Sequence, residues 1–470
     1  MNSADWSLAF RNLLRNRRRS LSTVAALAIG LAAILLFSGF KANLGYTMLT
    51  AYVRAGGHMQ IQHRDYYLYG SGNPTAYGIS DYQGLVEAIR KDPVLAPLLA
   101  VATPMLRFGG LAGNFDAGIS RTVIGTGYVA ADVQRMRTWN EYQVPITRPQ
   151  FPLEGAPPEA AIVGIGVARV LQLCAPLHIA SCANPAAAAP VLDKAGAALP
   201  SDIAGLAQAE HAATSAKTAP SGVKIELLSS SARGAPNVAA LDVVAAEDQG
   251  FKELDEISVI VQLAQAQKLV FGRAAPRVTS IMVLLNHSAD QAKAAARLEA
   301  LLAERGGAQP LVVRTFEDLN PFYVQSDQMF DVIFRFIFFL IGAIVLFTVG
   351  NTMNTAVIER TVEIGTLRAI GLRQSGVRRL FVIEGFVLGC VGTILGLLTA
   401  IAIGALVNRS GLTWLPPSSS ERLPLQLRVL AEVWNVSMTA IGLVVIATLS
   451  AWWPAWRASN LNVVEALRHA

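Results

Sequence analysis

The residues that could carry out chemistry are few in this sequence, and their spacing matches no catalytic motif. A phosphate-binding loop needs glycines that expose backbone N–H groups and a lysine that follows a glycine. The sequence contains no Gly-Lys pair, which excludes nucleotide hydrolysis by that route. Gly164-Ile165-Gly166 is the nearest glycine cluster. No third glycine follows at the dinucleotide-binding spacing, so we interpret it as a turn from a strand into a helix.

Metal and nucleophile chemistry find no better support. The six histidines form no pair that encloses a glutamate at the spacing of a zinc protease. His58 and His63 are the closest two, and their odd separation would place them on opposite faces of a strand. A Gly-x-Ser-x-Gly nucleophile turn is also absent. We therefore expect no catalytic residue and no metal site, and a membrane-anchored enzyme is an alternative without a supporting motif.

The elements that must position any functional residue are partly in lipid. Hydrophobic residues make up 53% of the 470 and charged residues only 15%, which excludes a disordered chain or a small disulfide scaffold. A helix of about 20 apolar residues crosses a membrane. Four charge-free stretches have about that length, namely 21–40, 336–358, 385–407 and 433–456. A fifth stretch, 170–192, is rich in proline and alanine and is interpreted as soluble.

The distribution of charge predicts the orientation. Segments 1–20, 359–379 and 457–470 carry net charges of +4, +3 and +1, whereas the whole chain carries +6. Short loops rich in Lys and Arg stay on the cytoplasmic side. We therefore expect both termini in the cytoplasm, and the basic charge marks the inner membrane face and not a nucleic-acid partner. The first span is longer than the apolar core of a signal peptide, which favours an uncleaved anchor.

The predicted fold is a membrane protein with four transmembrane helices, one and then three, around a large α+β extracytoplasmic domain. Period-two strands at 57–62 and 278–285 and helical patterns at 81–91 and 289–305 predict the mixed domain. The predicted order is a cytoplasmic amphipathic helix at 1–20, a first span at 21–42, the extracytoplasmic domain at 43–327 with a flexible Ala/Pro-rich insertion at 183–222, a second span at 328–358, a cytoplasmic segment at 359–379, a third span at 380–407, an outer loop at 408–432, a fourth span at 433–456 and a cytoplasmic tail at 457–470.

Two sets of small residues carry structural expectations. Cys174 and Cys182 lie in the outer segment, where a disulfide is possible and two free buried thiols are the alternative. Glycines at intervals of four, three and four share one face of the third span and predict close packing against another helix. They are Gly385, Gly389, Gly392 and Gly396. Glu384, beside them, is costly in lipid and should face protein or water, either as a packing contact or in a pathway.

The cytoplasmic segment 359–379 is longer than a hairpin needs. Two to eight residues, roughly, would close such a connection, and this one has 21. Ile364, Leu367 and Ile370 recur at intervals of three among charged residues. The pattern predicts a short amphipathic helix that offers an apolar stripe and arginines to a cytoplasmic partner.

Several stretches together resemble the permeases of the MacB/FtsX/LolC-LolE group of ABC transporters. They read AFRNLLRNRRR at 9–19, ERTVEIGTLRAIGL at 359–372, FVIEG at 381–385, WPAWRAS at 453–459 and VEALR at 464–468. One helix, a large outer domain and three helices is also the architecture of that group. The outer domain matches it only in outline. Some members carry a fused ATPase, whereas for this chain we expect the ATPase on a separate chain.

The resemblance implies a permease subunit of the bacterial inner membrane that transmits ATP-driven movement of a separate ATPase to its periplasmic domain. It implies two copies of an ABC ATPase subunit, which would hold ATP and Mg, and a second permease copy or a related permease. A periplasmic adaptor or lipoprotein and membrane lipid are further expected partners, and no cofactor is expected on this chain. The implied substrate is lipid-like, a lipoprotein or amphipathic; the alternative is an FtsX-like regulator that activates a periplasmic cell-wall hydrolase without transport. The implied ATPase-coupling residues are Glu359, Arg360, Glu363, Gly365, Thr366, Arg368, Ala369 and Gly371.

Overall fold

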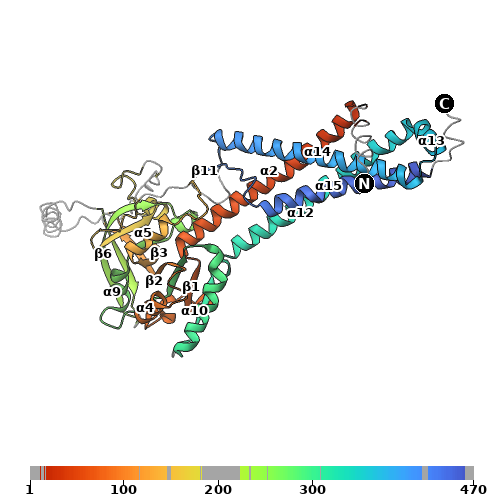
Figure 1. The fold of residues 1–470 in the computed structure, drawn as a ribbon. Helices are drawn as coiled ribbons and strands as arrows, with labels where there is room; N and C mark the ends of the chain where they lie inside the picture. Colours follow the sequence, from red (N-terminus) through yellow and green to blue (C-terminus); the bar gives the residue numbers. More distant parts are fainter. Residues whose placement is uncertain are drawn as a thin grey trace, which may run out of the picture. The chain divides into compact units, whose positions relative to one another are not determined.

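The computed structural model describes residues 11, 15, 17–115, 117–145, 150–179, 182, 223–231, 234–250, 252–306, 309–414 and 422–460. The chain divides into two compact units (Figure 1). The first takes the chain up to Met48, then Phe322–Trp414, then Pro424 onward. The second takes Leu49–Pro321 and Leu415–Leu423. The predicted amphipathic helix at 1–20, the insertion at 183–222 and the end of the tail lie largely or wholly outside the described residues.

The first unit is built on four long apolar helices, each longer than the ~20 residues that cross a bilayer. They are α2 (Arg17–Gly56), α12 (Pro321–Glu359), α14 (Gln374–Arg409) and α15 (Val433–Ser459). Their most apolar windows have mean hydropathies between 1.7 and 2.7. Each helix extends past its charge-free stretch because helical hydrogen bonds persist where the side chains become polar. The sequence pattern therefore marks the part suited to lipid and not the ends of the helix.

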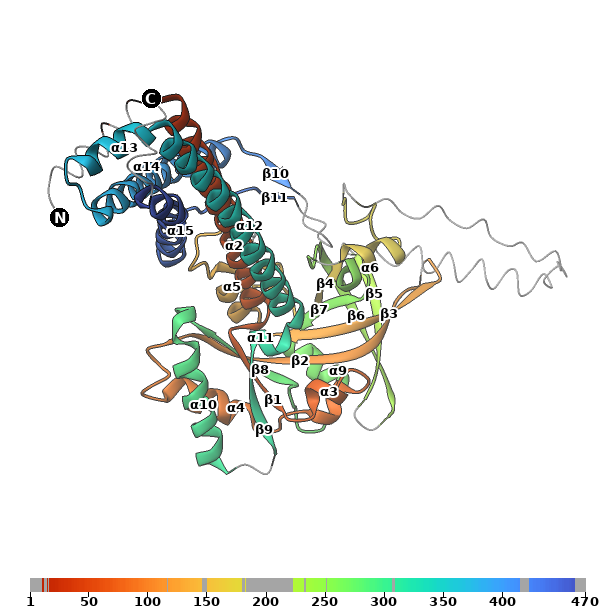
Figure 2. The same cartoon turned by 90° about the vertical axis from the view of Figure 1, so that its right-hand side faces the viewer.

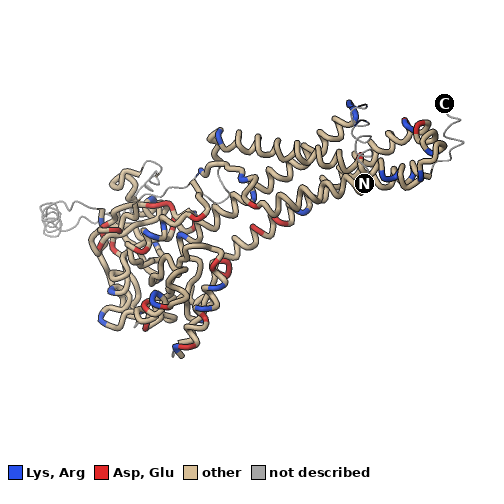
Figure 3. The backbone as a smooth tube through the Cα atoms, viewed as in Figure 1, with Lys and Arg blue, Asp and Glu red and all other residues tan. Residues whose placement is uncertain are grey.

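Charge along the first unit follows the same division. The four helices are tan over most of their length in Figure 3, and Lys and Arg gather at the end that carries α13 (Thr361–Ala369). A small hairpin, β10 (Thr413–Trp414) with β11 (Leu423–Pro424), lies between α14 and α15 in the chain. The core of this unit joins all four helices and includes Leu31, Val349, Phe381 and Leu443, each almost fully buried.

The second unit is a nine-stranded sheet covered by short helices (Figure 2). Its strands follow the order β3-β7-β4-β6-β5-β2-β8-β1-β9, and β3 also pairs with β2. Six strands therefore close into a ring, and β8, β1 and β9 extend from it. The strands are β1 (Met59–His63), β2 (Leu99–Asn114), β3 (Ile119–Tyr128), β4 (Ala160–Gly164), β5 (Val223–Ser230), β6 (Pro236–Glu247), β7 (Ser258–Gln262), β8 (Ser280–Leu285) and β9 (Leu311–Thr315).

Helices of the second unit pack against this sheet. They are α3 (Tyr66–Tyr69), α4 (Tyr82–Lys91), α5 (Ala130–Thr138), α6 (Ile165–Val170), α8 (Lys252–Asp255), α9 (Leu263–Phe271), α10 (Gln291–Arg305) and α11 (Phe316–Leu319), with short 3₁₀ turns at Pro74–Tyr77 and Ser288–Asp290. The core holds Phe108, Val163, Ile281 and Leu298 among others. Phe108 fits because the neighbouring Gly125 has no side chain: a Cβ there would lie 2.2 Å from the ring.

The predicted fold class is confirmed: one long apolar helix, a mixed α+β domain and three more long apolar helices. Inside the domain, the two predicted strands correspond to β1 and β8, and the two helical patterns to α4 and α10. The chain turns from β4 into α6 at Gly164, as the glycine cluster predicted. Gly166 is needed there because a Cβ would lie 2.8 Å from the Cα of Glu256.

The chain enters the second unit from α2 through β1 and leaves it from β9 into α12, and β1 and β9 are neighbouring strands. Helix α2 ends at Gly56, and β1 begins three residues later at Met59. β9 continues from Thr315 through α11 into α12. Met59 and Thr315 are directly paired in the β1–β9 ladder. Gly57, in the joint, has φ +77°, and a Cβ there would lie 2.7 Å from a backbone oxygen of Val283, so only glycine fits.

His58, which is fully buried, forms two hydrogen bonds at this connection. Its Nδ1 accepts the backbone N–H of Leu285 at 3.1 Å, and its Nε2 bonds the Ser288 hydroxyl at 3.0 Å. Ser288 donates in turn to Glu141 at 2.8 Å, which makes His58 the donor to Ser288 and fixes the neutral tautomer. Burial lowers the pKa of His58 to about 4. His63, on the far side of β1, stands beside Asp65, so the two histidines share no site.

Candidate functional site

The segment 359–379, predicted to be cytoplasmic, forms one short helix, α13, between α12 and α14. It ends at Ala369 with the pattern of hydrogen bonds that closes a helix at a glycine: Leu372 N–H bonds the Leu367 carbonyl at 3.0 Å and Gly371 N–H bonds Arg368 at 3.1 Å. Gly371 has φ +107°, which suits glycine alone. Gly371 therefore has a structural role in ending α13.

The predicted apolar stripe divides between the core and the surface. Ile364 is buried in the core of the helical unit, whereas Leu367 and Ile370 are exposed, Ile370 by 80%. Gly365 is buried beside Ile364. A stripe of constant spacing cannot reveal this, because in a helix this short its members point over a wide arc. Apart from Glu363 and Gly371, the exposed residues of α13 and its end form what we call the α13 surface: Val362, Thr366, Leu367, Ala369, Ile370 and Leu372.

Two exposed ion pairs join α13 and the end of α12 to Arg15, which precedes α2, and to Arg19 of α2. Arg15 donates from one nitrogen to both carboxylate oxygens of Glu363, at 2.8 and 3.0 Å. Arg19 bonds Glu359 through both of its terminal nitrogens, one at 2.9 Å. Each arginine and each glutamate is four positions from the other of its kind, one helical turn, so the two pairs form a short ladder. Exposed pairs of this kind are individually worth about 0–1 kcal/mol.

A third ion pair is buried. Arg360, at the start of α13, donates to Glu384 of α14 at 2.8 Å, and the two side chains are 7% and 2% exposed. A charged residue beside a membrane is tolerated only with such a partner. Glu384 thus faces protein, and its contact is one of packing. Removing one member of a buried pair typically costs about 3–5 kcal/mol.

The structure brings together some implied coupling residues and separates others. Glu359, Arg360 and Glu363 all bond this chain's own residues, whereas Thr366 and Ala369 belong to the exposed α13 surface. Arg368 lies in the last turn of α13, where a cation favours the helix dipole. The partners Arg15, Arg19 and Glu384 could not be assigned from sequence because each lies far from α13 along the chain.

The glycine face of α14 contacts two helices instead of one. A Cβ on Gly385 or Gly389 would meet α15, at 2.5 Å from Ala451 and 3.1 Å from Ala447. A Cβ on Gly392 would lie 2.5 Å from Leu27 of α2, and one on Gly396 would lie 2.8 Å from the Ala28 carbonyl oxygen. The face predicted to pack against a helix therefore contacts α15 in the half of α14 nearer α13, and α2 further along.

The connection from α14 to α15 also contacts α2. Leu427 bonds the Asn408 side chain through both its N–H and its carbonyl, at 2.7 and 3.1 Å. Arg428 donates its backbone N–H to Gly39 at 3.1 Å and its side chain to Asn43 at 3.2 Å. Gly39 leaves room for this loop, since a Cβ would lie 2.9 Å from the backbone nitrogen of Val429. Side-chain and backbone contacts thus join the helices both near α13 and at the connection from α14 to α15.

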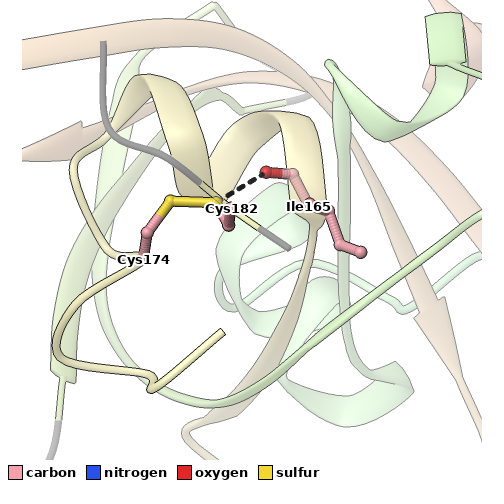
Figure 4. The surroundings of a disulfide bond; sticks show 3 residues. All are labelled: Ile165, Cys174 and Cys182. Carbon is pink, nitrogen blue, oxygen red and sulfur yellow. Dashed lines mark hydrogen bonds between the residues drawn. A yellow bond between two sulfur atoms is a disulfide. The ribbon is translucent and has the colours of Figure 1, made fainter. Parts of the chain in front are cut away.

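Cys174 and Cys182 form a disulfide in the second unit (Figure 4). Both are buried, and the Sγ of Cys182 lies 3.9 Å from the carbonyl oxygen of Ile165, which begins α6. Cys390, in α14, is a free cysteine. Over the described ranges, no three His, Cys, Asp or Glu side chains cluster as a metal site would require.

Known proteins are similar in sequence to parts of this chain. Residues 335–463 match the FtsX-like permease C-terminal family. The ABC transporter permease YtrF of Bacillus subtilis is 30% identical over 31% of this chain and 35% of its own length. The macrolide export ATP-binding/permease protein MacB of Bordetella avium is 27% identical over 38% of this chain and 27% of its own. The lipoprotein-releasing system transmembrane protein LolC of Xylella fastidiosa (strain Temecula1) is 25% identical over 47% and 53%.

These matches span between about a quarter and a half of the relatives' own lengths. Among solved structures, the periplasmic region of MacB from Actinobacillus actinomycetemcomitans covers 57% of this chain with 94% of its own, at 11% identity and a TM-score of 0.31. The extracellular domain of the transporter YknZ covers 55% with 99% of its own, at 10% identity and a TM-score of 0.28. Scores this low carry no inference about a partner or a substrate.

Proposed function

We propose that this chain, an ABC transporter permease with an FtsX-like C-terminal domain at residues 335–463, transmits movement from a separate ATPase to its outer domain. The observation that carries the proposal is the construction of α13. It exposes Leu367, Ile370 and Leu372 on its surface, and the same segment is bonded to α2 and α14. A helix that exposes apolar side chains to a partner, and that is bonded to its own membrane helices, is suited to transmit a displacement imposed by that partner.

The ion pairs define how such a push would spread. Glu359 bonds Arg19 of α2, and Glu363 bonds Arg15, which precedes α2 in the chain. Arg360 connects the segment to α14 through Glu384. α13 also follows α12 directly in the chain. Displacement of α13 would therefore act on three helices, and two of these, α2 and α12, continue into the paired strands β1 and β9.

The expected partner is an ABC ATPase, in two copies, paired with a second permease copy or a related permease. ATP and Mg would bind the ATPase, because this chain lacks the Gly-Lys pair of a phosphate-binding loop. Transport is accordingly the proposed role of this subunit, with hydrolysis on the partner. An adaptor or lipoprotein outside the membrane and membrane lipid are further proposed partners.

We place the chain in the bacterial inner membrane with both termini in the cytoplasm and the second unit in the periplasm. Segments 1–20 and 359–379 carry +4 and +3, which supports that orientation through the retention of Lys and Arg on the inner side. The disulfide between Cys174 and Cys182 supports it independently, since disulfides persist in oxidising compartments.

The proposed substrate is a lipid-like, lipoprotein or amphipathic molecule that is extracted or exported outside the inner membrane. Support comes from the described functions of similar proteins, lipoprotein release for LolC and macrolide export for MacB. Both cargo classes are amphipathic. The outer domain, and not the membrane helices, is the proposed site where the cargo is moved.

The α13 surface provides the test. The ATPase that copurifies with the tagged wild-type chain would be assayed in nanodiscs with the variants Leu367→Asp and Ile370→Asp. We expect each to lower stimulated ATP hydrolysis at least about tenfold, because a buried charge in an apolar contact costs more than about 1.4 kcal/mol. Leu412→Asp, at an equally exposed apolar position beyond the other end of α14, is the matched control. Full stimulation in both α13 variants would refute the coupling role.

A further inference from the structure

The strand β9 ends the sheet without a second neighbour. Six strands close into a ring, and β8 and β1 each have a strand on both sides. Among the nine strands of this sheet, as far as the structure describes them, β9 alone pairs on one side only, with β1. A sheet edge of this kind presents a row of backbone donors and acceptors to any extended chain that reaches it.

The pairing pattern shows which backbone groups face the open side. Pro310 accepts from Arg64 at 2.8 Å and Phe316 donates to His58 at 2.9 Å, so residues at these positions and every second one between them bond β1. The intervening residues turn their backbone groups outward. Of these, Thr315 N–H bonds the Asp318 carboxylate at 3.1 Å and Leu311 N–H bonds Gln309. Val313 therefore offers an N–H and a carbonyl together to the open side.

A groove of about 620 Å³ runs along this edge. It is lined by β9, by Leu302 and Ala303 of α10, and by Leu85 of α4. One end is closed by Gln309, whose side chain accepts from Ser80 N–H at 3.1 Å and donates to the Gly78 carbonyl at 2.9 Å. This side-chain amide pairs with backbone groups as a peptide group of an added strand would. The groove is lined by both Gln309 and Val313.

Charge is arranged unevenly around the edge. Arg305 at the rim is paired with Asp81 at 2.9 Å. Arg314 points from β9 to the other sheet face, where its guanidinium lies 5.6 Å from the ring centre of Tyr67. Its Nε is buried and, among the described residues, has no hydrogen-bond acceptor. An incoming carboxylate on that face would be attracted by the positive charge of the guanidinium.

We propose that an extended segment of a partner protein docks here as a tenth strand beside β9. Its backbone would pair with Val313, its apolar side chains would enter the groove over Leu302 and Ala303, and a carboxylate at an alternate position would meet Arg314. Side chains that lie directly opposite on paired strands share a face, so the apolar and acidic residues of the segment alternate. This proposal rests on the outer domain alone and goes beyond coupling to the ATPase.

The probe is a pool of synthetic eight-residue peptides with valine, isoleucine or leucine at alternate positions and one aspartate between them. Binding to the full chain in nanodiscs would be followed by fluorescence anisotropy and by hydrogen exchange at the Val313 amide. We expect saturable binding below about 1 mM with slowed exchange at Val313. The matched control pool carries N-methyl groups on alternate residues, which keep the side chains and remove the backbone donors.

Three substitutions locate the site. Val313→Pro removes the outward N–H, which an edge strand tolerates, and we expect about tenfold weaker binding; Val313→Thr should bind normally. Ala303→Trp should fill the groove and abolish binding, whereas Ala296→Trp, also exposed on α10, should not. Arg314→Gln should weaken aspartate peptides and spare their asparagine counterparts.

The overturning results are equally definite. The proposal fails if the pool leaves Val313 exchange unchanged at about 1 mM, or if the N-methylated pool binds as well as its parent. It fails also if Ala303→Trp binds like Ala296→Trp, a comparison that does not depend on the folding of Val313→Pro. None of these results bears on ATPase stimulation by the α13 surface.

Discussion

Arg360 and Glu384 form a buried ion pair, 2.8 Å between Nη1 and Oε1, that ties the start of α13 to α14. Both side chains are almost completely shielded from water, 7% and 2% exposed. Loss of one partner should therefore cost more free energy of unfolding in this pair than in the two exposed pairs beside it.

Removing one member of the buried pair should destabilise the helical unit strongly. Arg360→Ala leaves Glu384 charged and enclosed, and we expect a loss of about 3–5 kcal/mol in the free energy of unfolding. The double variant Arg360→Met/Glu384→Leu replaces both charges with apolar groups and should recover most of that loss. Thermal unfolding in detergent measures both. A double variant as unstable as Arg360→Ala would contradict the pairing.

The exposed pair of Arg15 and Glu363 should tolerate an exchange of its two charges. Arg15→Glu or Glu363→Arg places like charges together, and we expect each to lower ATPase stimulation about two- to fivefold, in line with the modest energy of exposed pairs. Both changes together restore opposite charges and should recover stimulation. The measurement is stimulated hydrolysis by the copurified ATPase at low and high salt. Equal losses in the single and double variants would remove Glu363 from the ladder.

The glycine face should reject even one methyl group. Gly385→Ala places its Cβ 2.5 Å from that of Ala451, both atoms fixed by backbone, and overpacking of this kind costs about 1–3 kcal/mol. Gly45→Ala in α2 is the control, because nothing lies within 4 Å of the added methyl there, and it should be neutral or slightly stabilising. Thermal unfolding compares the two. Equal stability would show that α14 and α15 are not packed at Gly385.

Two buried groups of the outer domain should give stability opposite pH dependences. Because burial lowers the pKa of His58 to about 4, this residue binds fewer protons in the folded chain than in the unfolded chain. Its contribution to the free energy of unfolding is therefore full above about pH 6.5 and is lost as the pH falls to 4. Burial raises the pKa of Asp255 to about 6, so that carboxyl favours the folded state at low pH and loses this as pH rises from 4 to 6. Each is worth about 3 kcal/mol at most.

The test is to remove one of the two. In Asp255→Asn the stability of the outer domain should rise with pH between 4 and 6.5 more steeply than in the wild type, because the opposing group is gone. Denaturant unfolding of the full chain at several pH values, followed by tryptophan fluorescence, gives the slopes. Parallel slopes in wild type and variant would refute the assignment to Asp255.

The disulfide makes a prediction about thiol counts. The chain has three cysteines, and with Cys174 bonded to Cys182 one thiol, that of Cys390, should react with a maleimide in unfolded, unreduced protein. Reduction should raise the count to three. Cys174→Ser should lower outer-domain stability by about 2–3 kcal/mol for a loop of this length. Three reactive thiols without reductant, in protein purified from the membrane, would contradict the periplasmic placement.

The fold could be predicted largely from the sequence because its strongest signals are local. Apolar runs marked four helices, alternation marked β1 and β8, and a glycine pair marked the turn from β4 to α6. The ring closed by β2 and β3 could not be predicted, since strand order depends on pairings between distant residues. For the same reason Gly392 and Gly396 could be assigned to a packed face but not to α2.

The candidate site was predictable in position and not in detail. The surplus length of 359–379 located α13, but the direction of each side chain depends on what the helix packs against. Ile364 fitted the stripe of Leu367 and Ile370 and nevertheless faces the core. Glu359 and Glu363 resembled partner-binding residues and are bonded to Arg19 and Arg15. Charge alone does not distinguish an internal partner from an external one.

The antiparallel pairing of Met59 with Thr315 determines how a pull on the two membrane helices would be resisted. Both helices attach to the same end of the β1–β9 ladder, so a common motion of α2 and α12 carries the two strands along together and strains none of their hydrogen bonds. A motion that spreads the helices would instead peel the ladder open one bond at a time, starting at that end. In the coupling that we propose, the β1–β9 ladder would therefore follow a shared displacement of the two helices and open under their separation.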